Sequence, residues 1–206
     1  MSLKYICQKC GTCCHEVPGD YIKRIPLYPD EVDGLINLAK DRGIFFKVIE
    51  DLVFPDVDNE KVYVLTYRIL LDNKNQCCPF YDNKKGCTIH NIKPLACQAY
   101  PLALKHIDAF NFQISIDPLC NFVIGEYNIL ENADLEKIKD IFEYEYPKAE
   151  NFYRKNKKLM FKIRQLEYEK KINITKQISI EDYNRALNEW NRVEITVGKE
   201  KKEDYT

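Results

Sequence analysis

The stretch Cys7-Gln8-Lys9-Cys10-Gly11-Thr12-Cys13-Cys14 places four cysteines within eight residues. The other cysteines of the chain are Cys77, Cys78, Cys87, Cys97 and Cys120, and none follows Cys120. Chance would scatter nine cysteines over 206 residues instead of gathering four of them in one short stretch. Because all cysteines lie in roughly the first 120 residues, we predict one metal centre built by this part of the chain.

Metal binding explains this use of cysteine better than disulfides or unligated thiols do. The number of cysteines is odd and their spacing is clustered. The segment from Met1 to Ile6 lacks the apolar core of a secretory signal, so we expect a cytoplasmic protein, whose thiols stay reduced. Structural thiols without a metal would be expected among apolar neighbours, whereas the first cluster contains Gln, Lys, Gly and Thr.

The spacing of the cysteines leaves the number of metals open. Cys-x2-Cys steps let Cys7, Cys10 and one of Cys13 or Cys14 converge on one ion. Side chains of adjacent residues tend to diverge, so each doublet predicts either neighbouring metals or one ligand beside one packing thiol. Eight thiolates would complete two four-coordinate sites or two cubane clusters and leave one cysteine over; nine could also build a three-metal cluster. The candidate ligands are Cys7, Cys10, Cys13, Cys14, Cys77, Cys78, Cys87, Cys97 and Cys120, with His15 and His90 as possible additions.

The rest of the chain predicts an α+β fold, with a small antiparallel sheet and cysteine-cluster loops followed by a helical C-terminal extension. Strand-like patterns precede residue 120, and helical periodicity dominates after residue 132. We therefore divide the chain into a cysteine-cluster metal-binding domain, residues 1–125, and a helical extension, residues 126–206. Helices are expected at 29–42, 133–146 and 152–172 and from Ser179 onward, strands at 44–49, 62–71, 103–107 and 112–116, and a frayed tail at 199–206.

Composition excludes several classes of protein. The formal net charge of −1 argues against extensive binding of nucleic acid, and no run of 18 apolar residues is present that could span a membrane. A Ser-His-Asp arrangement, a phosphate-binding loop and a dinucleotide fingerprint are also missing from the sequence. We expect a protein partner to bind the C-terminal helices.

The cysteine pattern resembles the YkgJ-type cysteine-cluster family of zinc- or iron-chelating proteins with a CxxCxxCC motif. The resemblance covers roughly residues 5–120. It rests on Cys7-x2-Cys10-Gly11-x-Cys13-Cys14, Cys78-Pro79-Phe80, Cys87-Thr88-Ile89-His90, Lys93-Pro94-x2-Cys97 and Tyr100-Pro101. His90, Lys93 and Gln98 depart from the Tyr, Arg and Arg usual in that family, which bears on substrate contacts more than on metal binding. One branch resembles flagellin lysine methylases, which implies that a catalytic role is possible.

Three functions follow from these observations. The first is an iron–sulfur or iron-binding component of a redox system or enzyme, because thiolates suit iron and its clusters. The second is a structural zinc module whose helices mediate an interaction. The third, implied only by the resemblance, is an enzyme related to protein lysine methylases. Whether the protein is an enzyme is left open by the sequence.

Overall fold

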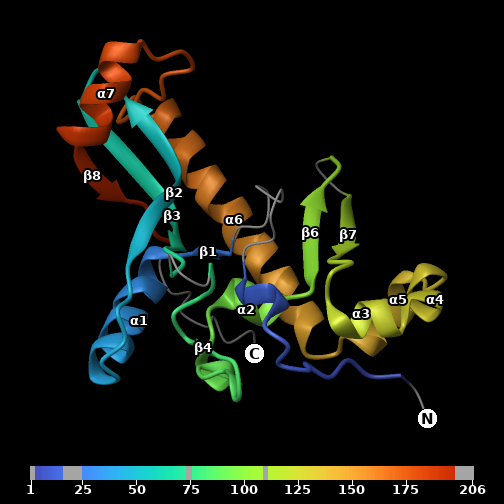
Figure 1. Ribbon diagram of the computed structural model, residues 1–206. Helices are drawn as coiled ribbons and strands as arrows, with labels where there is room; N and C mark the ends of the chain where they lie inside the picture. Colours follow the sequence, from blue (N-terminus) through green and yellow to red (C-terminus); the bar gives the residue numbers. More distant parts are fainter. Residues whose placement is uncertain (1–2, 16–24, 73–75, 109–110, 198–206) are drawn as a thin grey trace, which may run out of the picture.

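The computed structural model describes residues 3–15, 25–72, 76–108 and 111–197 (Figure 1). It has the α+β architecture that the sequence predicts, with helices beside small sheets. The elements in chain order are η1 Thr12–Cys14, β1 Pro26–Leu27, α1 Pro29–Asp41, β2 Val48–Asp56, β3 Lys61–Ile69, β4 Tyr81–Asp82, β5 Gly86–Cys87, η2 His90–Ile92, α2 Leu95–Ala99, β6 Leu102–His106, β7 Phe112–Ile116, α3 Asn121–Gly125, α4 Tyr127–Glu131, α5 Leu135–Ile141, α6 Glu145–Tyr168, α7 Ile180–Asn188 and β8 Asn191–Glu194.

The largest sheet is built around β3. β2 pairs antiparallel with β3, with Val53 opposite Val64, and β1 pairs antiparallel with it through Leu27 and Tyr67. β8 adds a parallel strand, with Val193 opposite Tyr63, so the sheet is mixed and not purely antiparallel. The two remaining pairs, β4 with β5 and β6 with β7, are antiparallel hairpins.

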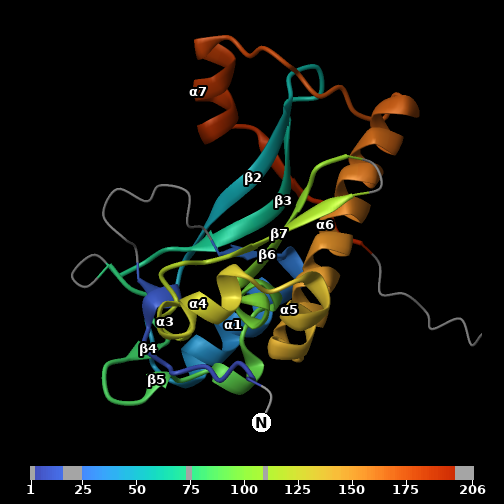
Figure 2. The same cartoon turned by 90° about the vertical axis from the view of Figure 1, so that its right-hand side faces the viewer.

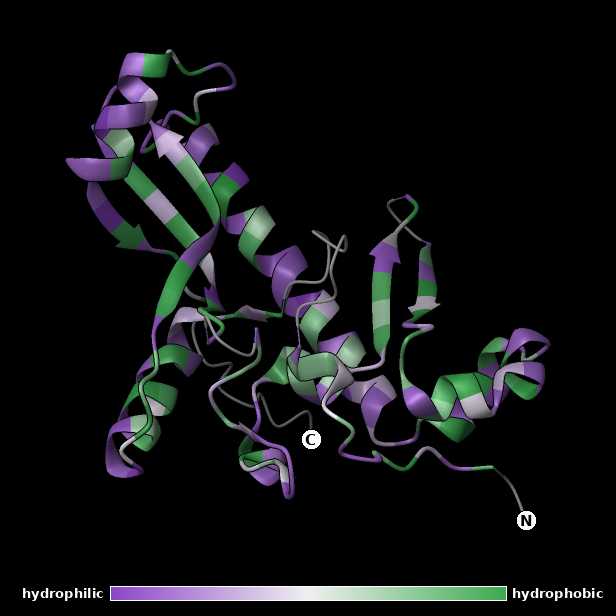
Figure 3. Cartoon of the chain, in the orientation of Figure 1, coloured by the Kyte–Doolittle hydropathy of each residue, from purple (hydrophilic) through white to green (hydrophobic). Residues whose placement is uncertain are grey.

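Helix α6 runs beside this sheet, as the two perpendicular views show (Figures 1 and 2). Hydrophobic and hydrophilic residues alternate along the helix (Figure 3). Its buried residues Leu159 and Ile163 pack with Tyr63 and Leu65 of β3 in one hydrophobic cluster. The apolar face of α6 therefore covers the sheet, as expected for an amphipathic helix.

The end of the described chain returns to the same sheet. The side chain of Ser179 caps α7 by accepting a hydrogen bond from the backbone N–H of Asp182, so this helix starts where the sequence predicts it. Ala186 and Trp190 then pack against Val62 and Val64. On its other side α7 exposes Ile180, Tyr183 and Leu187. The protein partner expected at the C-terminal helices stays a prediction.

A second core joins the two ends of the predicted cysteine domain to the helices that follow it. Tyr5, Ala99 and Cys120 belong to one buried cluster with Phe142 and Ala149. The backbone N–H of Tyr5 also donates to the carbonyl oxygen of Ile141, at 2.8 Å. Residues on both sides of position 125 share this core. The division of the chain at residue 125 stays a prediction.

Several predicted boundaries are wrong in the C-terminal part. The helix expected at 133–146 ends at Ile141, and the helix expected from residue 152 begins at Glu145. Pro147 lies in the first turn of α6, where the missing N–H of proline costs nothing, so it starts this helix instead of separating two helices. The predicted frayed tail at 199–206 lies outside the described residues.

The strand expected at 44–49 is also misplaced. Ile44 lies in the turn that ends α1, since its N–H donates to the carbonyl of Ala39 at 2.8 Å. The strand β2 begins at Val48 and continues through Pro55, which pairs with Val62. A proline is tolerated there because β2 is the outer strand beside β3. Within the described residues, no helix is long and apolar enough to span a bilayer.

Candidate metal centre

Backbone contacts bring the two cysteine-bearing segments together. The N–H of Cys78 donates to the carbonyl oxygen of Cys14 at 2.7 Å. His15 and Cys77 form an isolated antiparallel bridge beside this contact. The predicted convergence of the two cysteine groups is therefore present in the fold, and main-chain hydrogen bonding holds it.

The turn between Cys10 and Cys13 depends on Gly11. This residue has a φ of +84°, and a Cβ atom placed on it would lie 2.4 Å from Cζ of Tyr81. The Tyr81 hydroxyl donates to the carbonyl oxygen of Cys10 at 3.2 Å. The Tyr81 ring therefore excludes a side chain at position 11.

The β4–β5 hairpin closes the site from the other direction. Its Gly86 has a φ of +72°, and a Cβ there would lie 2.6 Å from Cβ of Lys9. Lys9 itself has a positive φ of 52°, which is uncommon for a side chain of this size. The close approach of Gly86 to Lys9 places Cys87 of the hairpin across from the first cluster.

Eight of the nine cysteines line one cavity of about 50 Å³. This volume is several times the ~10–15 Å³ that one water-sized sphere needs. Cys77 is the exception, because its buried side chain is not part of the lining. None of the nine cysteines forms a disulfide. The thiols at the cavity belong to Cys7, Cys10, Cys13, Cys14, Cys78, Cys87, Cys97 and Cys120.

Five of these thiols form one group, which we call the inner group: Cys13, Cys14, Cys78, Cys87 and Cys97. The sulfur atoms of Cys13 and Cys14 are 3.8 Å apart, and the thiols of Cys14 and Cys78 are hydrogen-bonded. Cys97 lies within electrostatic reach of Cys13, Cys78 and Cys87. Both members of the first doublet therefore face the same cavity, although adjacent side chains were expected to diverge.

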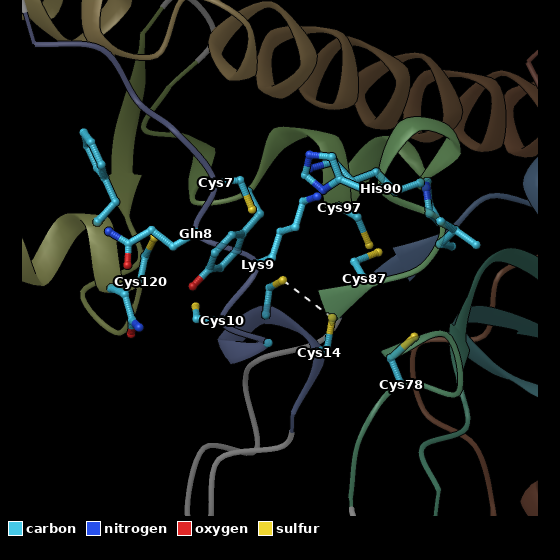
Figure 4. A pocket seen from close by; sticks show the side chains of 18 of the residues that line it. Cys7, Gln8, Lys9, Cys10, Cys14, Cys78, Cys87, His90, Cys97 and Cys120 are labelled. Atoms are coloured by element: carbon cyan, nitrogen blue, oxygen red, sulfur yellow. Dashed lines mark hydrogen bonds between the residues drawn. The ribbon is translucent and has the colours of Figure 1, made fainter. Parts of the chain in front are cut away.

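The other three thiols form the outer group: Cys7, Cys10 and Cys120. Cys120 lies within electrostatic reach of Cys10, and its thiol is hydrogen-bonded to the hydroxyl of Tyr5. Tyr5 in turn lies near Cys7. Figure 4 shows Cys7, Cys10 and Cys120 on one side of the cavity and Cys14, Cys78, Cys87 and Cys97 on the other. Cys10 is exposed, whereas Cys120 is 4% exposed.

Crowding and burial oppose the ionisation of Cys14 and Cys97 in the absence of a cation, whereas the pKa of Cys78 is lowered, chiefly by its hydrogen bond with the thiol of Cys14. The pKa of Cys14 is raised well above its ordinary value, because its thiol is hydrogen-bonded to those of Cys13 and Cys78 and is buried. The pKa of Cys97 is raised by burial and by its thiol neighbours. A bound cation removes this penalty by pairing with the thiolates, and metal ligation requires the thiolate form.

Backbone N–H groups are placed to stabilise thiolates at three positions. The sulfur of Cys78 accepts from the N–H of Phe80, and that of Cys87 accepts from the N–H of Ile89. Cys120 is hydrogen-bonded in the same way by the residues that follow it in α3. Hydrogen bonds to sulfur are one of the means by which proteins orient metal ligands and adjust their properties.

The remaining lining favours soft metals. None of the described residues around the cavity is Asp or Glu, so the oxygen ligands that Mg²⁺ and Ca²⁺ prefer are missing. His90 lines the cavity, and burial together with Lys93 and Lys9 lowers its pKa, which favours the neutral, ligating form. His15 is not part of this lining, and its Nδ1 lies 2.8 Å from the carbonyl oxygen of Gly11.

The thiols surround the cavity without reaching one common point. In the described part of the chain, no three Cys, His, Asp or Glu side chains lie close enough together to hold an ion as they stand. The donor set nevertheless fits zinc, iron or an iron–sulfur cluster, because eight sulfur donors face one small space. Sequence reasoning predicted all of these donors but did not identify the Tyr5 contact with Cys120.

Comparison with known proteins points to the same part of the chain. A family model described as "CxxCxxCC: Putative zinc- or iron-chelating domain" matches residues 6–121. The matched region contains every cysteine of the chain. Neither a curated protein nor a solved structure matches the chain.

Proposed function

Because the chain belongs to the CxxCxxCC family of zinc- or iron-chelating domains, we propose that its cysteine cavity holds iron, as an iron–sulfur cluster or as thiolate-bound ions. In this proposal the protein is a component of a redox system or of an enzyme. When bound, such a centre supplies one-electron transfer. The observation that carries the proposal is the convergence of eight thiols on one cavity.

The number of thiols favours iron over a single zinc ion. A structural zinc site is complete with four ligands, and eight thiols face this cavity. The doublet Cys13–Cys14 also directs both thiols to the same space, 3.8 Å apart. A single ion cannot coordinate eight thiolates, whereas a cluster or several ions would bind more of them.

The surroundings of the cavity suit a centre that changes its charge. The aromatic rings of Tyr5, Tyr100 and Phe122 line it, and burial and hydrogen bonds to sulfur set the reduction potential of a thiolate-bound cluster. Lys9 and Lys93 also line it and offset the negative charge of the thiolates. These groups support the redox proposal.

A structural zinc site is the second candidate, and one feature of the fold favours it. Four of the cysteines lie in short elements: Cys13 and Cys14 in the three-residue η1, Cys87 in the two-residue β5 and Cys97 in the five-residue α2. Elements this short do not bury enough apolar surface to hold their positions alone. Zinc ligation contributes folding free energy directly and would hold these segments together.

The visible absorption spectrum of the anaerobically purified protein, with a metal analysis of the same sample, separates the two candidates. Iron–sulfur and iron–thiolate centres absorb in the visible range, and zinc thiolates are colourless. We expect a coloured protein that contains iron. A colourless protein with stoichiometric zinc would establish the second candidate, and a protein without bound metal would contradict both.

A further inference from the structure

The two thiol groups differ in size and in access to solvent. The inner group has five thiols, one more than a tetrahedral site needs, and is linked by contacts among Cys13, Cys14 and Cys78. The outer group has three thiols, one fewer than such a site needs. Tyr100 lies within electrostatic reach of Cys120 in the outer group and Cys13 in the inner group, so the two groups are neighbours.

The outer group has no further ligand of the usual kind. Beside it the cavity is lined by Gln8, Asn121 and Phe122, and no described carboxylate lines the cavity. His90 lies near Lys93 and Lys9, and Figure 4 places it beside Cys97 of the inner group. A metal on Cys7, Cys10 and Cys120 would therefore keep one coordination position open.

Solvent reaches the outer group from the side of Cys10, which is exposed, whereas Cys7 is half-buried and Cys120 is buried. Structural metal sites are closed by four protein ligands, whereas catalytic sites use three and leave the fourth position for a ligand from outside. The inner group has enough half-buried thiols to close a site and matches the first type. The outer group has three thiols, one of them exposed, and matches the second.

We infer that the cavity holds two metal centres: a closed one on four thiols of the inner group, Cys87 among them, and an open one on Cys7, Cys10 and Cys120 that takes a small exogenous ligand. This inference rests on the proposed function, since it assumes that the cavity binds metal. It also accounts for the eight lining thiols, with four in the closed centre, three in the open centre and one beside them.

The test is the amount of metal per chain in single cysteine variants, purified anaerobically and analysed by mass spectrometry of the metal. Cys10→Ser removes an exposed thiol of the outer group, so it leaves the core intact. Cys87→Ser removes a thiol of the inner group. Cys77→Ser is the matched control, because Cys77 does not line the cavity.

We expect Cys10→Ser and Cys87→Ser each to lose part of the metal, about half if the centres contain equal numbers of ions. The double variant should lose nearly all of it, and Cys77→Ser none. Complete loss in Cys10→Ser would show one shared centre, and an unchanged content would show that the outer group binds nothing; either result overturns the inference. If Cys87→Ser does not fold, the fraction retained by Cys10→Ser and Cys120→Ser decides alone.

Azide tests the open position in the protein loaded with Co²⁺. We expect azide to change the visible spectrum of the wild type but not that of Cys10→Ser. An unchanged wild-type spectrum would mean that the outer centre is closed and would overturn that part of the inference. A wild type that binds no metal at all would instead contradict the proposed function, so the two failures are distinguishable.

Discussion

The backbone N–H of Cys78 donates a 2.7 Å hydrogen bond to the carbonyl oxygen of Cys14. The two residues belong to cysteine groups that are far apart in the sequence. A main-chain contact of this kind orders both segments before any thiol is ligated. Metal binding then costs less conformational entropy of the chain, because the two cysteine groups are already near each other. The cavity is thus prepared by the fold and completed by ligation.

Gly11→Ala should destabilise the first cysteine turn. The new Cβ would lie 2.4 Å from the Tyr81 ring, at a φ of +84° that side chains rarely adopt. We expect a loss of ~1–3 kcal/mol in the free energy of unfolding, measured by denaturant titration, together with reduced metal content. The control is Gly34→Ala in α1, where a Cβ meets nothing within 4 Å. It should be neutral or stabilising, and equal effects of the two variants would contradict the account.

Glu31 of α1 is hydrogen-bonded to the start of α2, the helix that carries Cys97. One carboxylate oxygen accepts from the N–H of Leu95 at 2.7 Å, and the other accepts from the N–H of Tyr28 at 2.9 Å. Glu31→Ala leaves both donors without this partner, so the free energy of unfolding should fall by ~1–3 kcal/mol. Asp33→Ala, at an exposed position of the same helix, should change it by less than ~0.5 kcal/mol. Thermal denaturation of the two variants side by side measures the difference.

Glu145 should make stability depend on pH. Its pKa is raised by burial, with Lys93 acting in the opposite direction, and its Oε2 atom is buried without a hydrogen-bond partner in the described structure. The folded state therefore keeps a proton that the unfolded chain has lost, and its stability falls as the pH rises from about 4.5 through the raised pKa.

Glu145→Gln removes this cost only where the carboxyl group is ionised. At pH 8 the free energy of unfolding of the variant should exceed that of the wild type by up to ~1 kcal/mol more than it does at pH 4. The effect is small because the side chain is partly exposed. Urea titrations at the two pH values measure it. A gain that is larger at pH 4 would have the wrong sign.

Local patterns in the sequence predicted most of the elements that position the site. The helix at 29–42 is found as Pro29–Asp41, because a proline at its start and apolar residues at helical spacing all favour it. The hairpin of β6 and β7 is also found within one residue of the prediction. These elements depend on neighbours in the sequence.

The features that the sequence did not predict depend on distant partners. β8 is four residues long and becomes a strand because it pairs with β3 far earlier in the chain. The short helices α3 and α4 gain their stability by burying Phe122, Val123 and Leu130 against Tyr5 and Phe142. The separation of the thiols into two groups is likewise a result of the fold, since spacing alone left several partitions open.

Removing the metal should destabilise the cysteine segments more than the C-terminal helices. The cysteine segments have short elements, whereas α6 and β3 share the buried residues Tyr63, Leu65, Leu159 and Ile163. In hydrogen exchange of the metal-free protein, we expect lost protection at residues 7–15 and 77–97 and little change in α6. Equal protection with and without metal in the cysteine segments would show that the cysteines are not structural ligands.

X-ray absorption at the metal edge of the anaerobically purified protein tests the central claim most directly, because it reports which atoms bind the metal. Eight thiols face the cavity and no described carboxylate does, so we predict a first shell dominated by sulfur, at about 2.3 Å for a thiolate ligand. A first shell dominated by oxygen or nitrogen would contradict the assignment of the cysteines as ligands.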